Sequence, residues 1–366
     1  MPLYMDIHII PGVKAKSVAE AHQKDMLMQE EHACKCMTYW VDEERENVFC
    51  LIEAPDKEAV VALHQKAHGL VPNKIIEVNQ ELVVSFLGRI YDPVDAATTD
   101  EGLKVFNDPS FRIILFTSTK DPALLRYELG VEKANELLNS CTNLIRHNLA
   151  VYDGREVQHP GTGFIASFTA AAKAVSCALS IQQAASSPEL KAAALKIGIN
   201  AGEPVSTTNK LFGDTIQFAR QLCFITNDSR IAVGSVVKEL AIKDHFQKPA
   251  NNILTLAPPD EILLELLFSK LEENWQNPDF TVSEFCQAMA MSQSQLYRKS
   301  VELTGLSPNL FLKEFRLEKA KELMNKQRYS ISQITFDTGF TSPSYFTKCF
   351  KKNYGLLPMA YLDLLH

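Results

Sequence analysis

Residues 281–358 contain the same pattern of two short helices twice. The first copy, residues 281–299, is echoed by residues 330–348, and Gly-Leu-Ser-Pro at 305–308 returns as Gly-Leu-Leu-Pro at 355–358. An internal repeat constrains a fold strongly, because two copies of one supersecondary unit are expected to fold alike and to do the same job. The chain is therefore predicted to end in an all-α domain that holds two helix-turn-helix units.

The capping residues place the helices of each copy. Three hydroxyl residues are each followed at the third position by Glu or Gln, as in a capping box: Thr281 with Glu284, Ser292 with Gln295, and Ser330 with Gln333. Tight turns are expected at residues 290–291 and 339–340, and in the second turn Gly339 can take a positive φ without a Cβ clash. The second helix then begins at Ser292 in the first copy and at Thr341 or Ser342 in the second.

A longer helix is predicted between the copies. Ser307 and Pro308 suit a cap and a first helical position, and apolar residues follow at helical spacing. They are Leu310, Phe311, Phe315, Leu317, Ala320, Leu323 and Met324. Such a helix would fix the separation of the two units.

The second helix of a helix-turn-helix unit enters the major groove of DNA, with its N-terminal residues nearest the base edges. The residues predicted to face a duplex are Gln293, Ser294, Gln295, Arg298 and Lys299 in the first copy and Ser342, Ser344, Thr347, Lys348 and Lys351 in the second. The residues predicted to lie in the core are Leu296, Val301, Phe346 and Phe350.

Local charge supports an interface with DNA. From Met291 to Lys352 there are eleven Lys or Arg against five Asp or Glu, in a chain whose formal charge is −7. A basic patch on an acidic protein is the expected footprint of phosphate binding. The alternative is a helical repeat that binds protein, with the lysines on an ordinary solvated face.

Residues 336–355, followed by Pro358 and Tyr361, resemble the signature of the AraC/XylS family of bacterial transcription regulators. The resemblance covers residues 262–366. It implies two helix-turn-helix units on a shared linker helix, which bind successive major-groove segments about 34 Å apart along one duplex face. It also implies double-stranded DNA and RNA polymerase as partners, and a separate sensing domain upstream.

The upstream part is long enough for further domains, since 366 residues predict two or three in all. No apolar run is long enough to span a bilayer, and Asp6 and His8 interrupt the apolar residues of the N-terminus, which lacks a signal-peptide pattern. The eight cysteines show no disulfide-like or CxxC spacing. We therefore predict a protein of the reducing cytoplasm with no membrane partner.

The first 90 residues alternate strands and helices. Residue patterning predicts strands at 4–9, 35–41, 47–53 and 74–78, and helices at 15–31 and 57–68. The order β-α-β-β-α-β is that of a ferredoxin-like unit. An α+β domain is therefore predicted over residues 1–90.

This segment also holds five of the nine histidines in the chain. Asp6 and His8 project from one face of a strand, and His64 and His68 project from one side of a helix. Imidazole and carboxylate together suit zinc, nickel, copper or iron, and spacing does not choose among them. The alternative is that the helical pair lies on a solvated face.

Several runs here are similar to a small family of ferredoxin-like bacterial domains described as nickel-binding. They include Pro-Leu-Tyr-Met-Asp-Ile-His at 2–8, Phe-Cys-Leu-Ile-Glu-Ala-Pro at 49–55 and Val-Ala-Leu-His-Gln-Lys-Ala-His-Gly at 61–69. The resemblance implies a divalent transition metal, nickel or zinc, held by the matching histidines, which are His8, His22, His64 and His68. Cys50 is a soft donor, but a small buried apolar role is the simpler prediction for it.

Residues 110–245 form a second alternating segment. Strands are predicted at 111–117, 195–202 and 231–233, with a hairpin over 157–168, a helix to about 147, a helix that ends before 188 and another from 211. This order predicts an α/β sandwich with one covered sheet. The flanking residues 91–109 and 247–259, rich in Pro, Asp, Asn and Thr, are predicted linkers.

Two runs in this segment, 196–202 and 211–215, resemble a class III adenylate/guanylate cyclase homology domain. That family uses two aspartates to hold two divalent ions, which act on a triphosphate. Ser118 and Thr162 stand where the aspartates are expected, and a hydroxyl does not replace a carboxylate as a ligand for a hard cation. The resemblance therefore implies an inactive domain for sensing and dimerisation rather than an enzyme.

Further positions depart from the cyclase pattern. Gln217 and Gln221 stand where that family has an asparagine and an arginine. The run Gly-Arg-Glu at 154–156 and Arg220 are candidate contacts for a phosphate or another anion, although surface arginines are common.

Together these features predict a dimeric, cytoplasmic transcription regulator whose upstream domains sense a metal or small ligand. Such coupling requires a difference in affinity between two states of the protein. Two alternatives belong to other classes. One is a divergent nucleotide cyclase with a DNA-binding appendage, and the other is a metal-buffering protein in which metal has no effect on DNA affinity.

Overall fold

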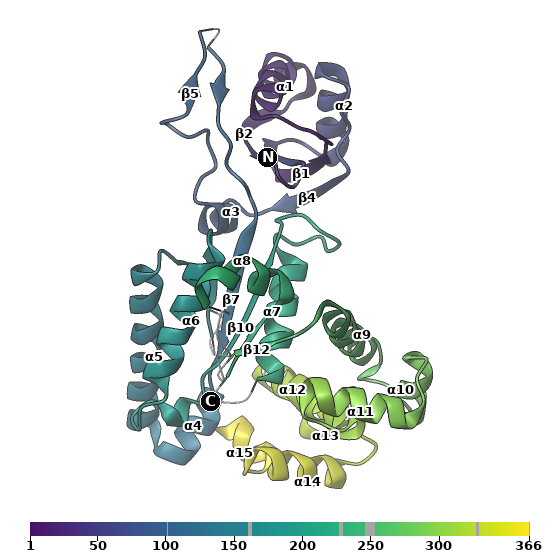
Figure 1. The fold of residues 1–366 in the computed structure, drawn as a ribbon. Coiled ribbons are helices and arrows are strands. Elements are labelled where there is room, and N and C mark those ends of the chain that lie inside the picture. Colours follow the sequence, from purple (N-terminus) through teal and green to yellow (C-terminus); the bar gives the residue numbers. More distant parts are fainter. Residues whose placement is uncertain (101, 160–162, 227–229, 246–252, 327–328, 366) are drawn as a thin grey trace.

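The computed structural model describes residues 1–365 apart from 101, 160–162, 227–229, 246–252 and 327–328, and no side chains at 242–245. It forms three bodies in chain order (Figure 1). The N-terminal domain stands at one end of the molecule, and the C-terminal helices pack beside the far end of the middle domain. No described helix is both long enough and apolar enough to cross a membrane.

The N-terminal domain has the predicted ferredoxin-like order. Its elements are β1 (Leu3–Ile9), α1 (Ala15–Met28), the short helix η1 (Gln29–His32), β2 (Lys35–Asp42), β3 (Asn47–Glu53), α2 (Lys57–Ala67) and β4 (Lys74–Val78). The sheet is antiparallel in the order β2-β3-β1-β4. The first helix is shorter than predicted, because the chain tightens into η1 and then turns at Ala33, which has φ 52°.

The two faces of this sheet have different partners. Met5, Ile7, Phe49 and Leu51 point to one face, where they join a buried core shared with the middle domain. Tyr4 and Cys50 point to the other face, which α1 and α2 cover. Because side chains alternate along a strand, Asp6 and His8 also lie on the covered face.

The connection to the middle domain is ordered. It contains α3 (Gln80–Leu87), which the sequence prediction missed, and the short strands β5 (Ala97–Thr98) and β6 (Lys104–Val105). Buried Arg112 donates hydrogen bonds to the carbonyl oxygens of Phe86 and Pro109 at 3.1 and 2.6 Å, so it holds the end of α3 on the middle domain. Arg89 binds Asp108 at 2.8 Å and stacks over Trp40.

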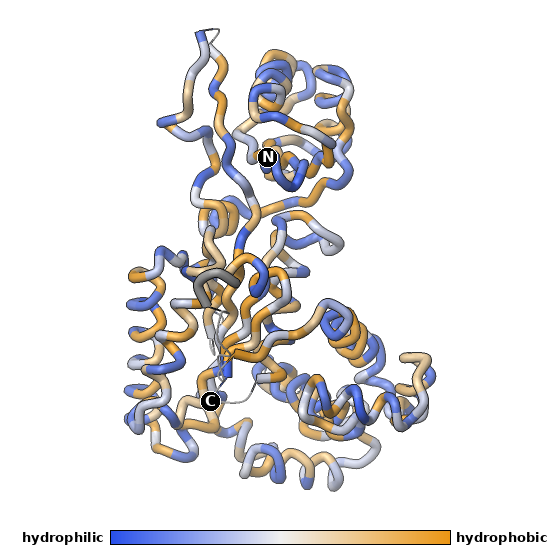
Figure 2. Tube along the Cα trace, in the orientation of Figure 1, coloured by the Kyte–Doolittle hydropathy of each residue, from blue (hydrophilic) through white to orange (hydrophobic). Residues whose placement is uncertain are grey.

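The middle domain is a six-stranded sheet with helices on both sides. Its elements are β7 (Arg112–Ser118), α4 (Pro122–Leu129), α5 (Val131–Val151), β8 (Arg155–Gln158), β9 (Ile165–Phe168), α6 (Ala171–Ala185), η2 (Lys191–Ala193), β10 (Lys196–Gly202), α7 (Gly213–Ile225), β11 (Ile231–Val233), α8 (Ser235–His245) and β12 (Ile253–Thr255). The strand order is β12-β11-β10-β7-β9-β8. Its central strands are strongly apolar (Figure 2), as expected for a sheet covered on both faces.

Two details of the middle domain differ from the prediction. The helix expected up to residue 147 is two helices, because Gly130 takes φ 82° between α4 and α5. The segment 247–259 contains β12, which pairs with β11 in parallel and completes the sheet. Apolar residues near 253–255 were too few for the sequence pattern to reveal a strand.

The C-terminal domain is all helical, as predicted. Its helices are α9 (Pro258–Asn274), α10 (Val282–Ala288), α11 (Gln293–Thr304), α12 (Pro308–Asn325), α13 (Ile331–Asp337), α14 (Pro343–Tyr354) and α15 (Pro358–Asp363). All three predicted capping boxes form. The turns fall where expected, since Ala290 has φ 51° and Gly339 has φ 74°.

Most of the predicted core of this domain is buried. Leu296, Phe346 and Phe350 are fully inside. Val301 is a correction, because its side chain is 38% exposed. It lies on the outer side of α11, where a single apolar residue among polar ones does not indicate burial.

The C-terminal domain packs on the middle domain at two places. Phe218 and Leu222 of α7 share a core with Phe268 and Phe311. Leu124 of α4 shares a second core with the other helix-turn-helix unit. The two DNA-reading units predicted from the sequence are therefore each seated on the middle domain.

Candidate metal centre and nucleic-acid interface

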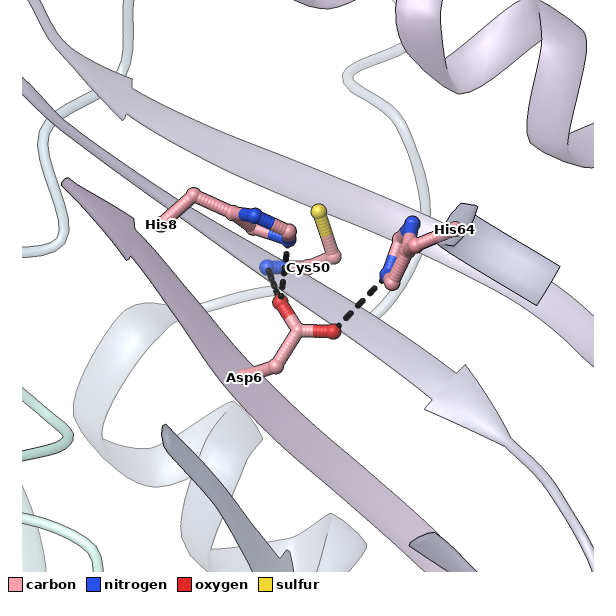
Figure 3. A group of neighbouring side chains, drawn as sticks. All are labelled: Asp6, His8, Cys50 and His64. Atoms are coloured by element: carbon pink, nitrogen blue, oxygen red, sulfur yellow. Dashed lines mark hydrogen bonds and ion pairs between the residues drawn. The ribbon is translucent and has the colours of Figure 1, made fainter. Parts of the chain in front are cut away.

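Four donor side chains meet on the covered face of the N-terminal sheet. Asp6 and His8 come from β1, Cys50 from β3 and His64 from α2, and all four are buried. Asp6 and Cys50 are direct partners in the strand register. Figure 3 shows the Cys50 sulfur between the His8 and His64 rings. One donor atom from each residue lies within 4.8 Å of all the others.

Asp6 organises this group. Its Oδ2 lies 3.0 Å from His64 Nε2, and its Oδ1 lies 3.4 Å from His8 Nε2 (Figure 3). The same Oδ1 accepts a hydrogen bond from the Cys50 backbone N–H at 3.2 Å. The carboxylate is thus fixed by the strand pairing that brings its neighbours together.

A second group shares His64. Its Nδ1 lies 3.2 Å from Asp25 of α1 and 3.1 Å from His68 Nε2. His68 Nε2 lies 3.2 Å from the Asp25 carboxylate. The three donor atoms of Asp25, His64 and His68 also lie within 4.8 Å of one another. The two edges of one imidazole therefore face two donor sets.

The charges of these groups are strongly coupled. Burial disfavours a charged His64, but the carboxylates of Asp6 and Asp25 outweigh it and raise the pKa of His64 to about 10. Burial likewise opposes ionisation of both acids, and the nearby imidazoles overcome it and hold the pKa of Asp6 and Asp25 below the usual value. The two buried carboxylates thus lie on either side of the His64 ring, and no described Lys or Arg pairs with either acid.

A cavity of about 210 Å³ leads to these donors from the side of α1. His8, His22, Asp25, Cys50 and His68 line it, together with apolar residues. Cavities that bind small ligands in proteins are mostly apolar with a few converging polar groups, and this one has that character.

The structure brings together three of the four predicted histidines. His8, His64 and His68 belong to the two donor groups, whereas His22 lines the cavity outside them, with its ring 5.2 Å from that of Tyr39. Burial lowers the pKa of His22, which favours its neutral form, and the carboxylates of Asp92 and Asp25 oppose the shift. The sequence prediction omitted Asp25 as a ligand. Its position three residues after His22 on a helix was the available signal.

The donor set fits a borderline transition metal. Imidazole, thiol and carboxylate together suit zinc, nickel, copper and iron, whereas calcium and magnesium prefer oxygen alone. The burial of Asp6 and Asp25 without a Lys or Arg partner among the described residues is a second observation, because buried charge is normally paired or bound to metal. A bound cation would displace the proton that His64 carries between Asp6 and Asp25.

The helix-turn-helix units expose the second helix of each pair. The turn before α11 spans residues 289–292, and the turn before α14 spans 338–342, which is one residue longer. The repeat therefore aligns with an offset of fifty residues in these helices rather than the forty-nine that the sequence comparison used. On this register Arg298 is equivalent to Lys348 and Ser294 to Ser344, and all four are exposed.

Several other candidates have local partners. Gln295 closes the capping box with Ser292. Lys299 pairs with Asp260 of α9 at 3.5 Å and with Glu302 at 3.0 Å, and its equivalent in α14 is buried Cys349. Position 299 therefore faces the protein, which is a different orientation from the one predicted.

The side chains of the remaining candidates are at least partly exposed. Ser342 caps α14, accepting from Tyr345 N–H at 3.4 Å. Gln293 and Lys351 are exposed, and Thr347 is half-buried. These positions stay predictions for contact with DNA.

In the middle domain Ser118 ends β7, at the position that the cyclase resemblance assigns to a metal-binding aspartate. Thr162 lies outside the described residues. Gln217 is exposed, while Gln221 is buried and its Oε1 has no hydrogen-bond partner among the described residues. Arg155 lies at the outer edge of the sheet on β8, and Arg220 lies on α7.

Two family models match the chain. Residues 4–78 match the nickel responsive protein SCO4226-like family, and residues 285–363 match a helix-turn-helix domain family. The solved structure of SCO4226 from Streptomyces coelicolor is 30% identical, with a TM-score of 0.20, over 21% of this chain and 94% of that one. A bacterial light-regulated adenylyl cyclase matches over 66% of this chain and 87% of that one, but at 14% identity and a TM-score of 0.31. The resemblance to cyclases stays a prediction.

Curated relatives match through one segment of this chain. Histidine kinase P4 of Formosa agariphila is 38% identical over 108 residues, which are 30% of this chain and 8% of that protein. The HTH-type transcriptional regulator MtrA of Neisseria gonorrhoeae is 31% identical over 99 residues, which are 27% of this chain and 31% of that protein. The chain thus spans less than a third of the length of these relatives. It joins an N-terminal domain of the SCO4226-like family to a C-terminal helix-turn-helix domain of the AraC type.

Proposed function

We propose that this protein is a sequence-specific DNA-binding transcription regulator and that its N-terminal domain senses a divalent transition metal. The observation that carries the proposal is the equivalent placement of Arg298 on α11 and Lys348 on α14, each exposed on the second helix of a helix-turn-helix unit. Helices at these places in such units read base edges and contact phosphates. The single helix α12 connects the two units.

The metal would be held by the donors around His64. Asp6, His8 and Cys50 lie at one edge of the ring, and Asp25 and His68 lie at the other. An ion at the first edge would neutralise Asp6 and hold α2 to β1 and β3, and an ion at the second edge would neutralise Asp25 and hold α2 to α1. Nickel and zinc are the proposed ions, since the domain belongs to a family described as nickel responsive and the donor set suits both.

The DNA-binding part is tested by selecting binding sites from random duplex DNA with the full-length protein. We expect one enriched sequence with two half-sites about one helical turn apart. The double variant with Arg298→Ala and Lys348→Ala should lose that enrichment, while Lys133→Ala, on the outside of α5, should keep it. If no sequence is enriched by the wild-type protein, the proposal is wrong.

The selected DNA also separates this function from the two alternatives. Stoichiometric metal binding with no change in DNA affinity would favour a metal-buffering protein. Formation of a cyclic nucleotide from a triphosphate would favour a divergent cyclase, whose metal ligands the residues at 118 and 162 do not provide. Homodimerisation and contact with RNA polymerase stay predictions, which sedimentation with DNA and a transcription assay would test.

A further inference from the structure

A cavity of about 730 Å³ lies where the middle domain meets the C-terminal domain. Its floor is the end of the sheet at Ser118 and Lys196, one wall is α7 at Arg220, and the opposite wall is α12 at Glu314 and Lys321. The end of α14 closes it. Cavities that hold small organic ligands have volumes of roughly 300–1,000 Å³, so the space is large enough for one.

Most charges in this cavity already have partners. Lys120 pairs with Glu128 at 2.6 Å. Lys321 pairs with Glu318 at 3.0 Å and with Asp121 at 3.6 Å. These acids also accept hydrogen bonds from tyrosines of the C-terminal domain, Asp121 from Tyr361 at 2.7 Å and Glu318 from Tyr354 at 2.8 Å.

Two cations have no carboxylate within ion-pair distance among the described residues. They are Lys196 at the start of β10 and Arg220 on α7. Lys196 stands directly opposite Ser118 in the strand register, so both residues line the cavity at the same end of the sheet. The Arg220 guanidinium lies over the Phe116 ring at 5.2 Å, two residues before Ser118 on the same strand face.

One acid in the cavity is also unpaired among the described residues. Burial raises the pKa of Glu314 on α12, and the neighbouring Lys313 and Lys196 only partly oppose this. A half-buried carboxyl group without a protein partner is stabilised when a ligand in the cavity donates a hydrogen bond to it. The cavity thus offers cationic donors on the middle-domain side and an acceptor on the C-terminal side.

We propose that this cavity is an effector site for a small organic anion that also carries a hydroxyl or amino group. Lys196, Arg220 and the Ser118 hydroxyl hold the phosphate or carboxylate group, and Glu314 accepts from the donor group. The site is separate from the metal centre, which lies in the N-terminal domain. Its regulatory role rests on the proposed function as a DNA-binding regulator.

Binding at this site couples the two domains. Because the ligand contacts both walls, it stabilises the arrangement in which the C-terminal domain is seated on the middle domain. Tyr354 ends α14, one of the proposed recognition helices, so the seated arrangement constrains that helix. A ligand that prefers one arrangement changes DNA affinity, and DNA changes the ligand affinity by the same factor.

The test uses full-length protein and two pairs of probes at constant ionic strength, with chloride as the reference. Inorganic phosphate and glycerol phosphate form one pair, and acetate and lactate form the other. We expect saturable thermal stabilisation by one pair, as required when a ligand binds only the folded state, and stronger binding by its hydroxyl-bearing member. The pair that binds identifies the anionic group.

Variants locate the binding. Arg220→Gln and Lys196→Gln should each weaken the effective probe at least about tenfold, the effect of losing one charge-assisted hydrogen bond. Ser118→Asp places a carboxylate opposite Lys196 and should abolish binding, because the new negative charge pairs with Lys196 and repels the anion. Lys191→Gln, exposed nearby and outside the cavity, should bind as the wild type does.

Stabilisation by neither pair, or equal stabilisation of all variants, would overturn the effector site. This readout contains no DNA, so it fails or succeeds independently of the proposed function. On selected DNA, the effective probe should change affinity at least about threefold in the wild type and not in Arg220→Gln. No change at saturation would overturn the regulatory role.

Discussion

At the residue scale, the proposed metal centre includes two buried acids, Asp6 and Asp25, as well as histidines. The sequence revealed His8, His64 and His68 through their spacing on a strand and a helix. For Asp25 it offered only the spacing from His22 on one helix, because which side of α1 faces α2 depends on packing between helices and not on local periodicity. Cys50 was judged apolar from its residue type, and its strand register with Asp6 places it among the donors.

We predict that Asp6→Asn weakens nickel and zinc binding at least about tenfold, since the loss of even an outer hydrogen-bond partner of a metal ligand costs that much. The amide keeps the size of the side chain but not its charge. Isothermal titration calorimetry on the full-length protein measures the effect. Glu20→Gln, exposed on α1, is the control and should bind like the wild type. Equal affinity of Asp6→Asn and the wild type would place the metal elsewhere.

Neighbouring cations on α11 should differ in their contribution to DNA binding. Arg298 is exposed and has no ion pair among the described residues, whereas Lys299 binds Asp260 and Glu302. Arg298→Ala should cost roughly 1–3 kcal/mol of binding free energy if the side chain contacts a base, and Lys299→Ala should cost clearly less. Fluorescence anisotropy with the selected duplex compares them. A larger loss for Lys299→Ala would mean that α11 faces DNA with its other side.

At the element scale, the capping boxes made the C-terminal helices predictable from sequence. A side chain that caps its own helix acts within three residues, so its effect can be read locally. Two features could not be predicted in this way. The extra residue before α14 changes the register of the repeat, and β12 depends on pairing with β11, which is distant in the sequence.

Two glycines of the C-terminal domain allow a matched test of its turns. Gly339 and Gly305 have nearly the same positive φ, 74° and 72°. A Cβ added at Gly339 would lie 2.4 Å from the Trp275 carbonyl oxygen, whereas a Cβ added at Gly305 would have no neighbouring atom within 4 Å. Gly305→Ala should cost about 1–2 kcal/mol through the backbone alone. Gly339→Ala should cost roughly 1–3 kcal/mol more, the range for forced overpacking. Chemical denaturation followed by circular dichroism measures both. Equal losses would show that the turn relaxes.

At the scale of the whole molecule, the N-terminal sheet lies between the proposed metal centre and the middle domain. Donor residues occupy the helix-covered face, and the opposite face shares a core with Ile114 and Phe212. Lys74, at the start of β4, donates to three consecutive carbonyl oxygens of the middle domain, those of Ser206, Thr207 and Thr208, at 2.6, 2.6 and 2.9 Å. A displacement of the N-terminal sheet would therefore move Lys74 and change its contact with residues 206–208 of the middle domain.

Lys74→Ala should leave metal affinity unchanged and reduce the effect of metal on DNA affinity, because it weakens contact between the domains and not the metal centre. Calorimetry and DNA titrations with and without nickel measure the two quantities. Lys57→Ala, exposed at the start of α2, is the control. An undiminished metal effect in Lys74→Ala would exclude this contact from the coupling.

The most direct test of the account is the affinity of the full-length protein for its selected DNA, measured across salt concentrations with and without nickel or zinc. We predict specific, salt-dependent binding whose affinity changes several-fold with metal, and no such change in Asp6→Asn. Specific binding that is equal with and without metal, at concentrations that saturate the wild-type metal centre, would contradict the proposal of a metal-responsive regulator.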